Sequence, residues 1–253
     1  MTTKKTHFTH LVNTMGTVVT LDVFTYTPLS TESLSPYFNS AALALCSIND
    51  LFSTFIPSSP MSQFIAGHLD EADLPKEITE VLALSSKLRD LTRGYFDPWA
   101  LPLAPDPTGL VKGYAASVAL LHLNNPDFET VIVNAAGDIA VRSPSPIKVG
   151  VTDPTSPHNL LFAVQVKDAI ATSSDFLAPG HLFDPLLARP SHNAQQATVT
   201  GPDLATADAL ATALCVAGPH LLDALDDLPD YEAALVTDAG LVCSPGFSVI
   251  KLK

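Results

Sequence analysis

The sequence contains few cysteines, few basic residues and no long apolar run, and each shortage argues against a class of protein. Cys46, Cys215 and Cys243 are odd in number and lack CxxC spacing, which favours free thiols in a reducing compartment. The 13 basic residues against 26 acidic ones give a formal net charge of -13, which argues against nucleic acid or an anionic membrane surface as a partner. No apolar run reaches the about 18 residues that a membrane helix needs, so we expect no membrane insertion.

The first ten residues contain two lysines but no apolar stretch after them. We therefore expect neither a signal peptide nor a lipidation motif, and the cytoplasm is the simplest location. Because the chain is so acidic, binding of an anionic ligand needs a local positive charge or local hydrogen-bond donors, such as a metal ion, a lysine or backbone N–H groups.

The hydrophobic pattern predicts an α+β fold in a single domain, residues 1–253, with mixed or antiparallel sheets and flanking helices. Alternation of apolar and polar residues predicts strands, over 9–27, 148–153, 160–172, 231–238 and 247–251, and residues 129–142 are predicted to form a strand, a tight turn and a second strand. Helical spacing predicts helices, over 33–52, 74–93 and 112–123. A further helix is expected between Asp203, which can cap its start, and Gly218, which can end it.

The stretch from Thr206 to Leu214 carries Asp208 and Thr212 on one face of this last helix, one turn apart. Its other residues are small and apolar, so the helix should be buried, and a buried carboxylate needs a partner. Two interpretations are open. Asp208 and Thr212 bind Mg2+ through oxygen atoms, or Asp208 caps the helix start while Thr212 bonds back to its own helix.

Three loops hold further candidates. Tyr95, Phe96 and Asp97 follow the Gly94 that ends a helix, where an ordinary helix-to-loop turn is the alternative. Asp106–Lys112 is a glycine-containing loop that we expect to open the 112–123 helix, with the lysine near free N–H groups suited to phosphate. It lacks the order of a Walker A loop. Gly180–Pro185 places His181, Phe183 and Asp184 together, although a lone histidine is usually structural.

Taken together and in order, nine segments resemble the ApbE family, the FAD:protein FMN transferases. They lie between about residues 15 and 240. The matching segments are 15–17, 52–55, 94–98, 106–115, 133–138, 149–154, 171–173, 181–185 and 207–214.

The resemblance implies a fold with FAD in a cleft, and a Mg2+-dependent reaction that attaches FMN to a Thr or Ser of a target flavoprotein and releases AMP. FAD is then the substrate. Some members are instead described as Mg2+-dependent FAD pyrophosphatases, and a non-catalytic FAD-binding protein is a third reading. By the same match, Asp208, Thr212 and the main-chain carbonyl of Gly109 bind the metal. The match places FAD contacts at Met15, Phe55, Tyr95, Phe96, Asp97, Asp106, Lys112 and Phe183.

The match also makes His181 the candidate general base for the acceptor hydroxyl, a role that suits histidine as a residue type. Asp184, three residues later, can either orient His181 or cap a turn. Lys112 and the metal would share the charge of the pyrophosphate.

The chain departs from the family pattern at several positions. Phe55 replaces a usual Tyr, and Ala136 and Ser174 replace usual glycines. Phe176–Pro179 replaces an acidic-Arg pair, and 186–188 replaces the end of an Asp-Pro-x-Thr-Gly motif. These changes add Cβ atoms or bulk near the expected FAD and target surfaces and leave the metal residues unchanged, so binding of FAD and Mg2+ is better supported than efficient transfer.

Overall fold

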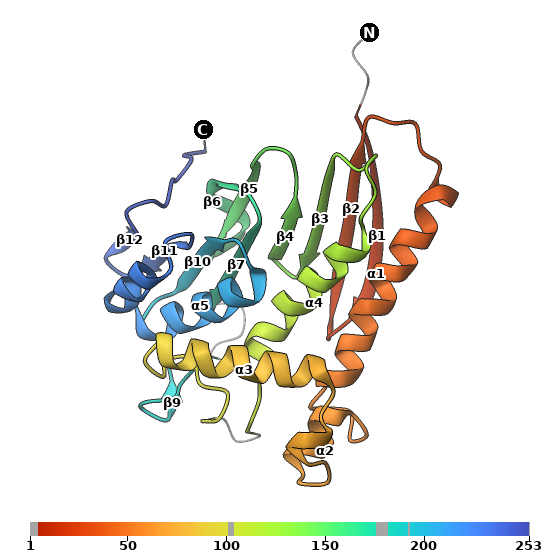
Figure 1. Ribbon diagram of the computed structural model, residues 1–253. Helices are drawn as coiled ribbons and strands as arrows, with labels where there is room; N and C mark the ends of the chain where they lie inside the picture. The colour runs from red at the N-terminus through yellow and green to blue at the C-terminus, as the bar shows by residue number, and fades with distance from the viewer. Residues whose placement is uncertain (1–4, 101–103, 176–181, 192, 253) are drawn as a thin grey trace.

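The computed structural model describes residues 5–100, 104–175, 182–191 and 193–252. Its centre is an eight-stranded antiparallel sheet in the order β1-β2-β3-β4-β7-β10-β11-β12 (Figure 1). The strands are β1 Thr6–Thr14, β2 Thr17–Thr25, β3 Thr130–Ala135, β4 Asp138–Arg142, β7 Ala169–Ser174, β10 Gln196–Gly201, β11 Glu232–Thr237 and β12 Gly240–Cys243. The fold class is α+β, as predicted, and every strand pairing in this sheet is antiparallel.

Helices cover one face of the sheet and pack side by side in the order α1, α4, α5 (Figure 1). The helices and helical turns are α1 Thr31–Phe52, α2 Pro60–Ile65, η1 Glu71–Asp73, α3 Lys76–Leu91, α4 Thr108–His122, α5 Leu204–Ala217 and η2 Pro219–Asp227. The main hydrophobic core lies between the sheet and these helices.

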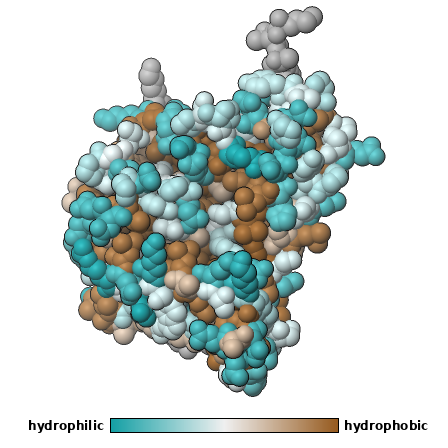
Figure 2. Space-filling view, viewed as in Figure 1, coloured by the Kyte–Doolittle hydropathy of each residue, from teal (hydrophilic) through white to brown (hydrophobic). Residues whose placement is uncertain are grey.

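Two smaller antiparallel pairs stand apart from the main sheet: β5 Ile147–Asp153 with β6 Ser156–Val166, and β8 Phe183–Asp184 with β9 Arg189–Pro190. Residues of the β5–β6 pair form a second hydrophobic core together with residues of the main sheet. In this core Phe162 packs edge-on against Phe247. Figure 2 shows that polar and apolar residues are interspersed on the helical side of the molecule. Within the described residues, no helix has the length and apolar character needed to cross a membrane.

The helices predicted over 33–52 and 74–93 are confirmed within a few residues, as are the caps of α5. The Asp203 side chain accepts a hydrogen bond from the N–H of Thr206, and the helix ends at Gly218 with a φ of 85°. Nearly every residue of α5 is buried, because it contacts α4 on one side and strands β7 and β10 on another. This is the buried helix that the small, apolar residues predicted.

Three kinds of expectation about element boundaries need correction: strands that were merged, a final strand, and the start of a helix. First, the 9–27 and 160–172 stretches are not single strands. Two-residue turns, Met15–Gly16 and 167–168, divide them into β1 and β2 and into β6 and β7. Alternation continues across such a turn, so the pattern alone does not reveal it. The final stretch 247–251 forms only an isolated bridge between Ile250 and Ala163.

The third correction concerns α4, which begins at Thr108 rather than at residue 112. Pro107 precedes it, and the Asp106 carboxylate accepts a hydrogen bond of 3.0 Å from the N–H of Thr108. These residues start the helix one turn early, because proline fits a helix start and the carboxylate satisfies a first-turn donor. Lys112 therefore lies in the second turn of α4, not among its free N–H groups.

Candidate functional site

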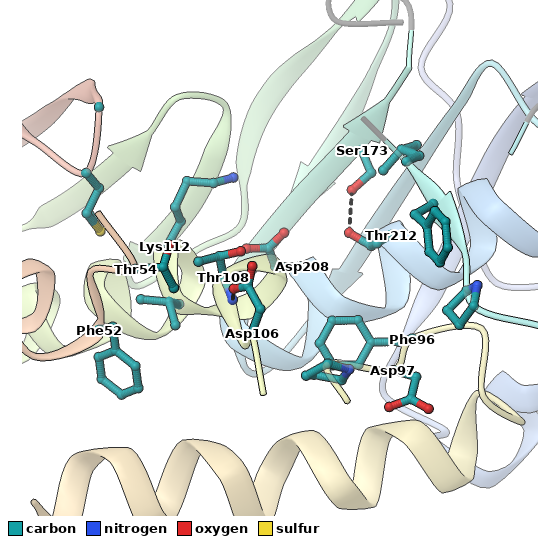
Figure 3. Close-up of a pocket in the computed structure, with 18 of the residues that line it drawn as sticks. Phe52, Thr54, Phe96, Asp97, Asp106, Thr108, Lys112, Ser173, Asp208 and Thr212 are labelled. Atoms are coloured by element: carbon teal, nitrogen blue, oxygen red, sulfur yellow. Dashed lines mark hydrogen bonds between the residues drawn. The ribbon is translucent and has the colours of Figure 1, made fainter. Parts of the chain in front are cut away.

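A pocket of about 630 Å³ opens where the ends of several elements meet. Its walls come from the β1–β2 turn, the loop after α1, the segment after α3, the start of α4, the end of β7, the β8 segment and α5 (Figure 3). Of the twelve predicted site residues, eleven line it: Met15, Phe55, Tyr95, Phe96, Asp97, Asp106, Gly109, Lys112, Phe183, Asp208 and Thr212. Segments that are far apart in the chain are thus brought to one cavity.

The twelfth residue, His181, lies outside the described residues. Its neighbour Asp184 is described, and the carboxylate accepts hydrogen bonds from the N–H groups of Leu186 at 2.9 Å and Leu187 at 3.1 Å. Asp184 is also buried, with 2% of its surface exposed. Of the two roles considered for Asp184, capping a turn is the one observed.

The close approach of α4 and α5 explains why Lys112 and Asp208 share this pocket. A Cβ added to Gly113 would lie 2.6 Å from the carbonyl oxygen of Leu204, so only glycine allows the two helices to come this near. Gly113 follows Lys112 directly, and Leu204 begins the helix that carries Asp208. In Figure 3 the Asp208 side chain lies between those of Lys112 and Thr212.

Asp208 is 3% exposed, and its Oδ2 has no hydrogen-bond partner among the described residues. Burial raises the pKa of this carboxyl well above its usual range, and the nearby Asp138 charge adds to the rise. Lys112 and the N–H of Gly113 oppose it. A buried carboxylate oxygen without a donor is costly, so this atom is a natural ligand for a cation.

Thr212 does not bond back to its own helix. Its Oγ1 lies 3.0 Å from the Oγ of Ser173 at the end of β7, and either hydroxyl can be the donor (Figure 3). The helix is capped by Asp203, and Asp208 stands in the second turn. The interpretation in which Asp208 caps the helix start and Thr212 bonds back to its own helix is therefore wrong.

Lys112 and Asp138 form an ion pair at the back of the pocket, with 2.9 Å between Nζ and Oδ2. Burial would lower the pKa of Lys112, but the carboxylates of Asp208 and Asp138 outweigh that effect and raise it. Lys112 is accordingly a permanent cation facing two acids, which is the local positive charge that an acidic chain needs to accept an anionic ligand.

Aromatic residues surround the mouth of the pocket. Phe55 is 93% exposed in the loop after α1, whereas Phe96 is buried and would contact a Cβ on Gly109 at 3.1 Å. The Tyr95 hydroxyl lies 3.0 Å from His220 Nε2, and Asp97 accepts a hydrogen bond from the N–H of Trp99. Phe55 thus has a free face for a planar ligand. Phe96 packs closely against Gly109 in the first turn of α4.

The predicted metal ligands include one carboxylate, and the described part of the chain has no group of three His, Cys, Asp or Glu side chains able to hold a metal. A cation here would depend on Asp208 together with neutral oxygens. Such a set, completed by water or substrate phosphate, is typical of Mg2+. The orphaned Oδ2 of Asp208 fits this requirement.

Sequence reasoning missed the roles of two residues that the structure ties to the pocket. Asp138 appeared only within the matching segment 133–138, yet it holds Lys112. Ser173 was noted only as part of a motif, yet it holds Thr212. Asp138 directly follows the two-residue turn between β3 and β4, but this local pattern does not reveal its contact with Lys112.

Comparison with known proteins adds the family. A family model described as "ApbE family" matches residues 15–105 and 102–235. The chain belongs to the ApbE family. Solved ApbE structures share its fold. The ApbE protein from Thermotoga maritima is 22% identical, with 95% of this chain and 97% of that chain covered and a TM-score of 0.80. The flavin transferase ApbE from Vibrio cholerae is 18% identical, with 98% of each chain covered and a TM-score of 0.76.

A curated relative is the FAD:protein FMN transferase of Rhodobacter capsulatus. It is 29% identical over 169 residues, which is 58% of this chain. The chain spans about a third of that relative's length, since 32% of the relative is covered.

The departures from the ApbE pattern can be located in part. Ala136 has a φ of 60° in the β3–β4 turn, a left-handed conformation that costs a residue with a Cβ about 1 kcal/mol. Ser174 lines the pocket, and Leu186 and Leu187 are 54% and 56% exposed. Residues 176–179 lie outside the described residues.

Proposed function

We propose that this chain is a Mg2+-dependent FAD:protein FMN transferase. It would cleave FAD, attach FMN through a phosphoester to a Thr or Ser of a target flavoprotein, and release AMP. The observation that carries the proposal is the meeting of eleven predicted site residues in one pocket of a chain that belongs to the ApbE family. The name of the Rhodobacter capsulatus relative supports the same activity.

The charges in the pocket suit a pyrophosphate. Asp208, Thr212 and the carbonyl of Gly109 would hold Mg2+, which supplies Lewis-acid neutralisation of the phosphate oxygens when bound. Lys112 would add a second positive charge on the same side of the pocket. Phe55 would lie against the flavin ring, because an almost fully exposed aromatic side chain gains by being covered.

His181 is proposed as the base that accepts the proton of the acceptor hydroxyl. The support is its place in the family motif, directly before Leu182 and Phe183, both of which line the pocket. Oδ1 of Asp184 is engaged in its own turn, and a role of Asp184 in orienting His181 stays a prediction.

The functional unit is proposed to be one domain over residues 1–253. The support is that a single sheet contains strands from β1, near the start of the chain, to β12, near its end. The cytoplasmic location stays a prediction.

A second candidate function is hydrolysis of FAD to FMN and AMP, with water in place of the acceptor hydroxyl. The observation that favours it is the altered surface beside the pocket, where Leu186 and Leu187 are exposed in place of the usual motif. Such a surface could still admit FAD while holding an acceptor protein less well.

One assay separates these functions from simple FAD binding. The purified chain is incubated with FAD, Mg2+ and an acceptor domain that carries the family's flavinylation motif. Fluorescent covalent labelling of the acceptor identifies a transferase. AMP without label identifies a pyrophosphatase, and retained FAD without either product identifies a binding protein.

Asp208→Asn provides the test of the metal site in the same assay. We expect loss of Mg2+-dependent product, because the neutral amide cannot replace the carboxylate as a ligand. Asp22→Asn is the matched control, since Asp22 lies on β2 outside the pocket and bonds to His7 and Thr9. Turnover at the wild-type level in Asp208→Asn would refute the metal assignment.

A further inference from the structure

Asp138 is a buried charged residue beside the pocket to which the proposed reaction assigns no role. Its side chain is 3% exposed, and both of its oxygens are engaged. Oδ2 pairs with Lys112 Nζ at 2.9 Å, and Oδ1 accepts a hydrogen bond of 3.2 Å from the N–H of Thr172. A carboxylate this buried and this fully bonded is fixed in place.

The strand register explains the position of Asp138. It begins β4 directly after the Ala136–Gly137 turn, and β4 pairs with β7 through Ile139 and Ile170. The strands are antiparallel, and β7 continues beyond the first residues of β4. The N–H of Thr172 therefore has no backbone partner on the β4 side. The Asp138 side chain accepts this N–H and is thereby anchored at the junction of two strands.

Lys112 lies near two carboxylates but is bonded to one. In the described part of the chain its only ion pair is with Asp138. Asp208 also acts on Lys112 through its charge, yet its Oδ2 stays without a partner. The ammonium group is therefore bonded to Asp138 and not to Asp208, although both carboxylates act on it.

From this geometry we propose that Asp138 is a positioning residue that keeps Lys112 off Asp208 and so leaves Asp208 free for a divalent cation. The inference rests on the proposed metal site. Without Asp138, the nearest anionic partner for Lys112 would be Asp208, and the lysine would occupy the oxygen that the cation needs. Lys112 would then be an internal competitor of the metal rather than a neighbour of it.

A double-mutant cycle on cation affinity tests this proposal without turnover. Binding of Mn2+ alone is measured by electron paramagnetic resonance for the wild type, Asp138→Asn, Lys112→Met and the double variant. If Asp138 restrains Lys112, Asp138→Asn weakens Mn2+ binding by about tenfold when Lys112 is present and by less than about threefold when Lys112→Met is also present. Thermal unfolding of each variant establishes that it is folded.

Simple attraction of the cation by the Asp138 charge gives a different result. In that case Asp138→Asn weakens binding by the same factor in both backgrounds, and equal factors overturn the proposal. Lys76→Met and Glu80→Gln, at an exposed ion pair on α3 with 3.0 Å between the charged atoms, form the control cycle and should show no coupling.

Two further outcomes are informative. If Asp138→Asn alone fails to fold, comparison of Lys112→Met with the double variant still decides, because a tenfold loss between those two overturns the proposal and a loss below threefold supports it. If wild-type protein binds no Mn2+, both this inference and the metal site are overturned. The proposed transfer of FMN is judged separately by labelling of the acceptor, so the two failures are distinguishable.

Discussion

The hydroxyl oxygens of Ser173 and Thr212 lie 3.0 Å apart and join β7 to α5 at the wall of the pocket. Thr212 is one turn after Asp208 on the same helix, so this hydrogen bond fixes the direction of the threonine oxygen relative to the carboxylate. A metal site with one carboxylate depends on such neutral oxygens being held in place. The strand end thus contributes to a site whose proposed ligands lie on helices.

Ser173→Ala tests this dependence. Loss of the hydrogen bond leaves Thr212 free to rotate, and we expect Mn2+ affinity to fall by about three- to tenfold, in line with one hydrogen bond of about 0.5–1.5 kcal/mol. The measurement is Mn2+ titration of the apoprotein. Ser143→Ala is a matched control. The Ser143 hydroxyl forms the same kind of hydrogen bond, with 3.1 Å to the hydroxyl of Thr130, and neither residue lines the pocket. Unchanged affinity in Ser173→Ala would show that Thr212 needs no support.

Gly113→Ala should separate the two helices that carry Lys112 and Asp208. The added Cβ would meet the Leu204 carbonyl at 2.6 Å and the Ala205 Cα at 2.9 Å, and both are backbone atoms that cannot turn aside. We expect the free energy of unfolding to fall by about 1–3 kcal/mol, as for overpacked interiors. Urea unfolding measures this change. Stability equal to wild type would mean that α4 and α5 are not this close in solution.

Asp208 makes the stability of the apoprotein depend on pH. Its folded pKa is raised above its unfolded value by burial, so the favourable contribution exists at low pH, where the group is protonated in both states. That contribution is lost as pH rises through the folded pKa. Asp208→Asn removes the titrating group, so we expect the variant to be more stable than wild type at neutral pH, with the difference disappearing below about pH 4.

Thermal unfolding in the presence of a chelator, repeated from pH 4 to pH 8, measures this difference. The chelator is needed because a bound cation would stabilise the charged carboxylate and reverse the effect. A wild type that is more stable than Asp208→Asn at neutral pH without metal would contradict the argument. Asp22→Asn, at a half-exposed ion pair on the sheet, should show no such rise at neutral pH.

Much of the site could be predicted from sequence because its residues lie in local patterns. Asp208 and Thr212 are one helical turn apart, and both side chains line the pocket. The start of α4 was misplaced because propensity alone does not show that Asp106 and Pro107 set the first turn.

The contacts that cross the fold were beyond reach of the sequence. Lys112 and Asp138 are 26 residues apart, and Ser173 and Thr212 are 39 apart, so no local spacing relates them. Their pairing depends on the strand order β4-β7-β10 and on the close packing of α4 against α5. Gly113 carried a hint of that packing, but only the structure identifies the backbone that it contacts.

Phe55 provides a test of how FAD is bound, independent of metal and turnover. Phe55 is 93% exposed at the pocket edge, so a planar ligand that covers its ring would bury apolar surface. Stacking of a planar ring on an aromatic side chain contributes about 1–3 kcal/mol, so Phe55→Ala should weaken FAD binding by about fivefold or more. Phe55→Tyr, the residue usual in the family, should bind FAD at least as tightly as wild type. Quenching of flavin fluorescence on titration measures both affinities.

Ile56→Ala is the neighbouring control, because Ile56 is 38% exposed and is not part of the pocket wall. If Phe55→Ala and Ile56→Ala had the same small effect, the flavin ring would have to lie elsewhere in the pocket, where Tyr95 and Phe183 are the other aromatic lining residues that are not fully buried.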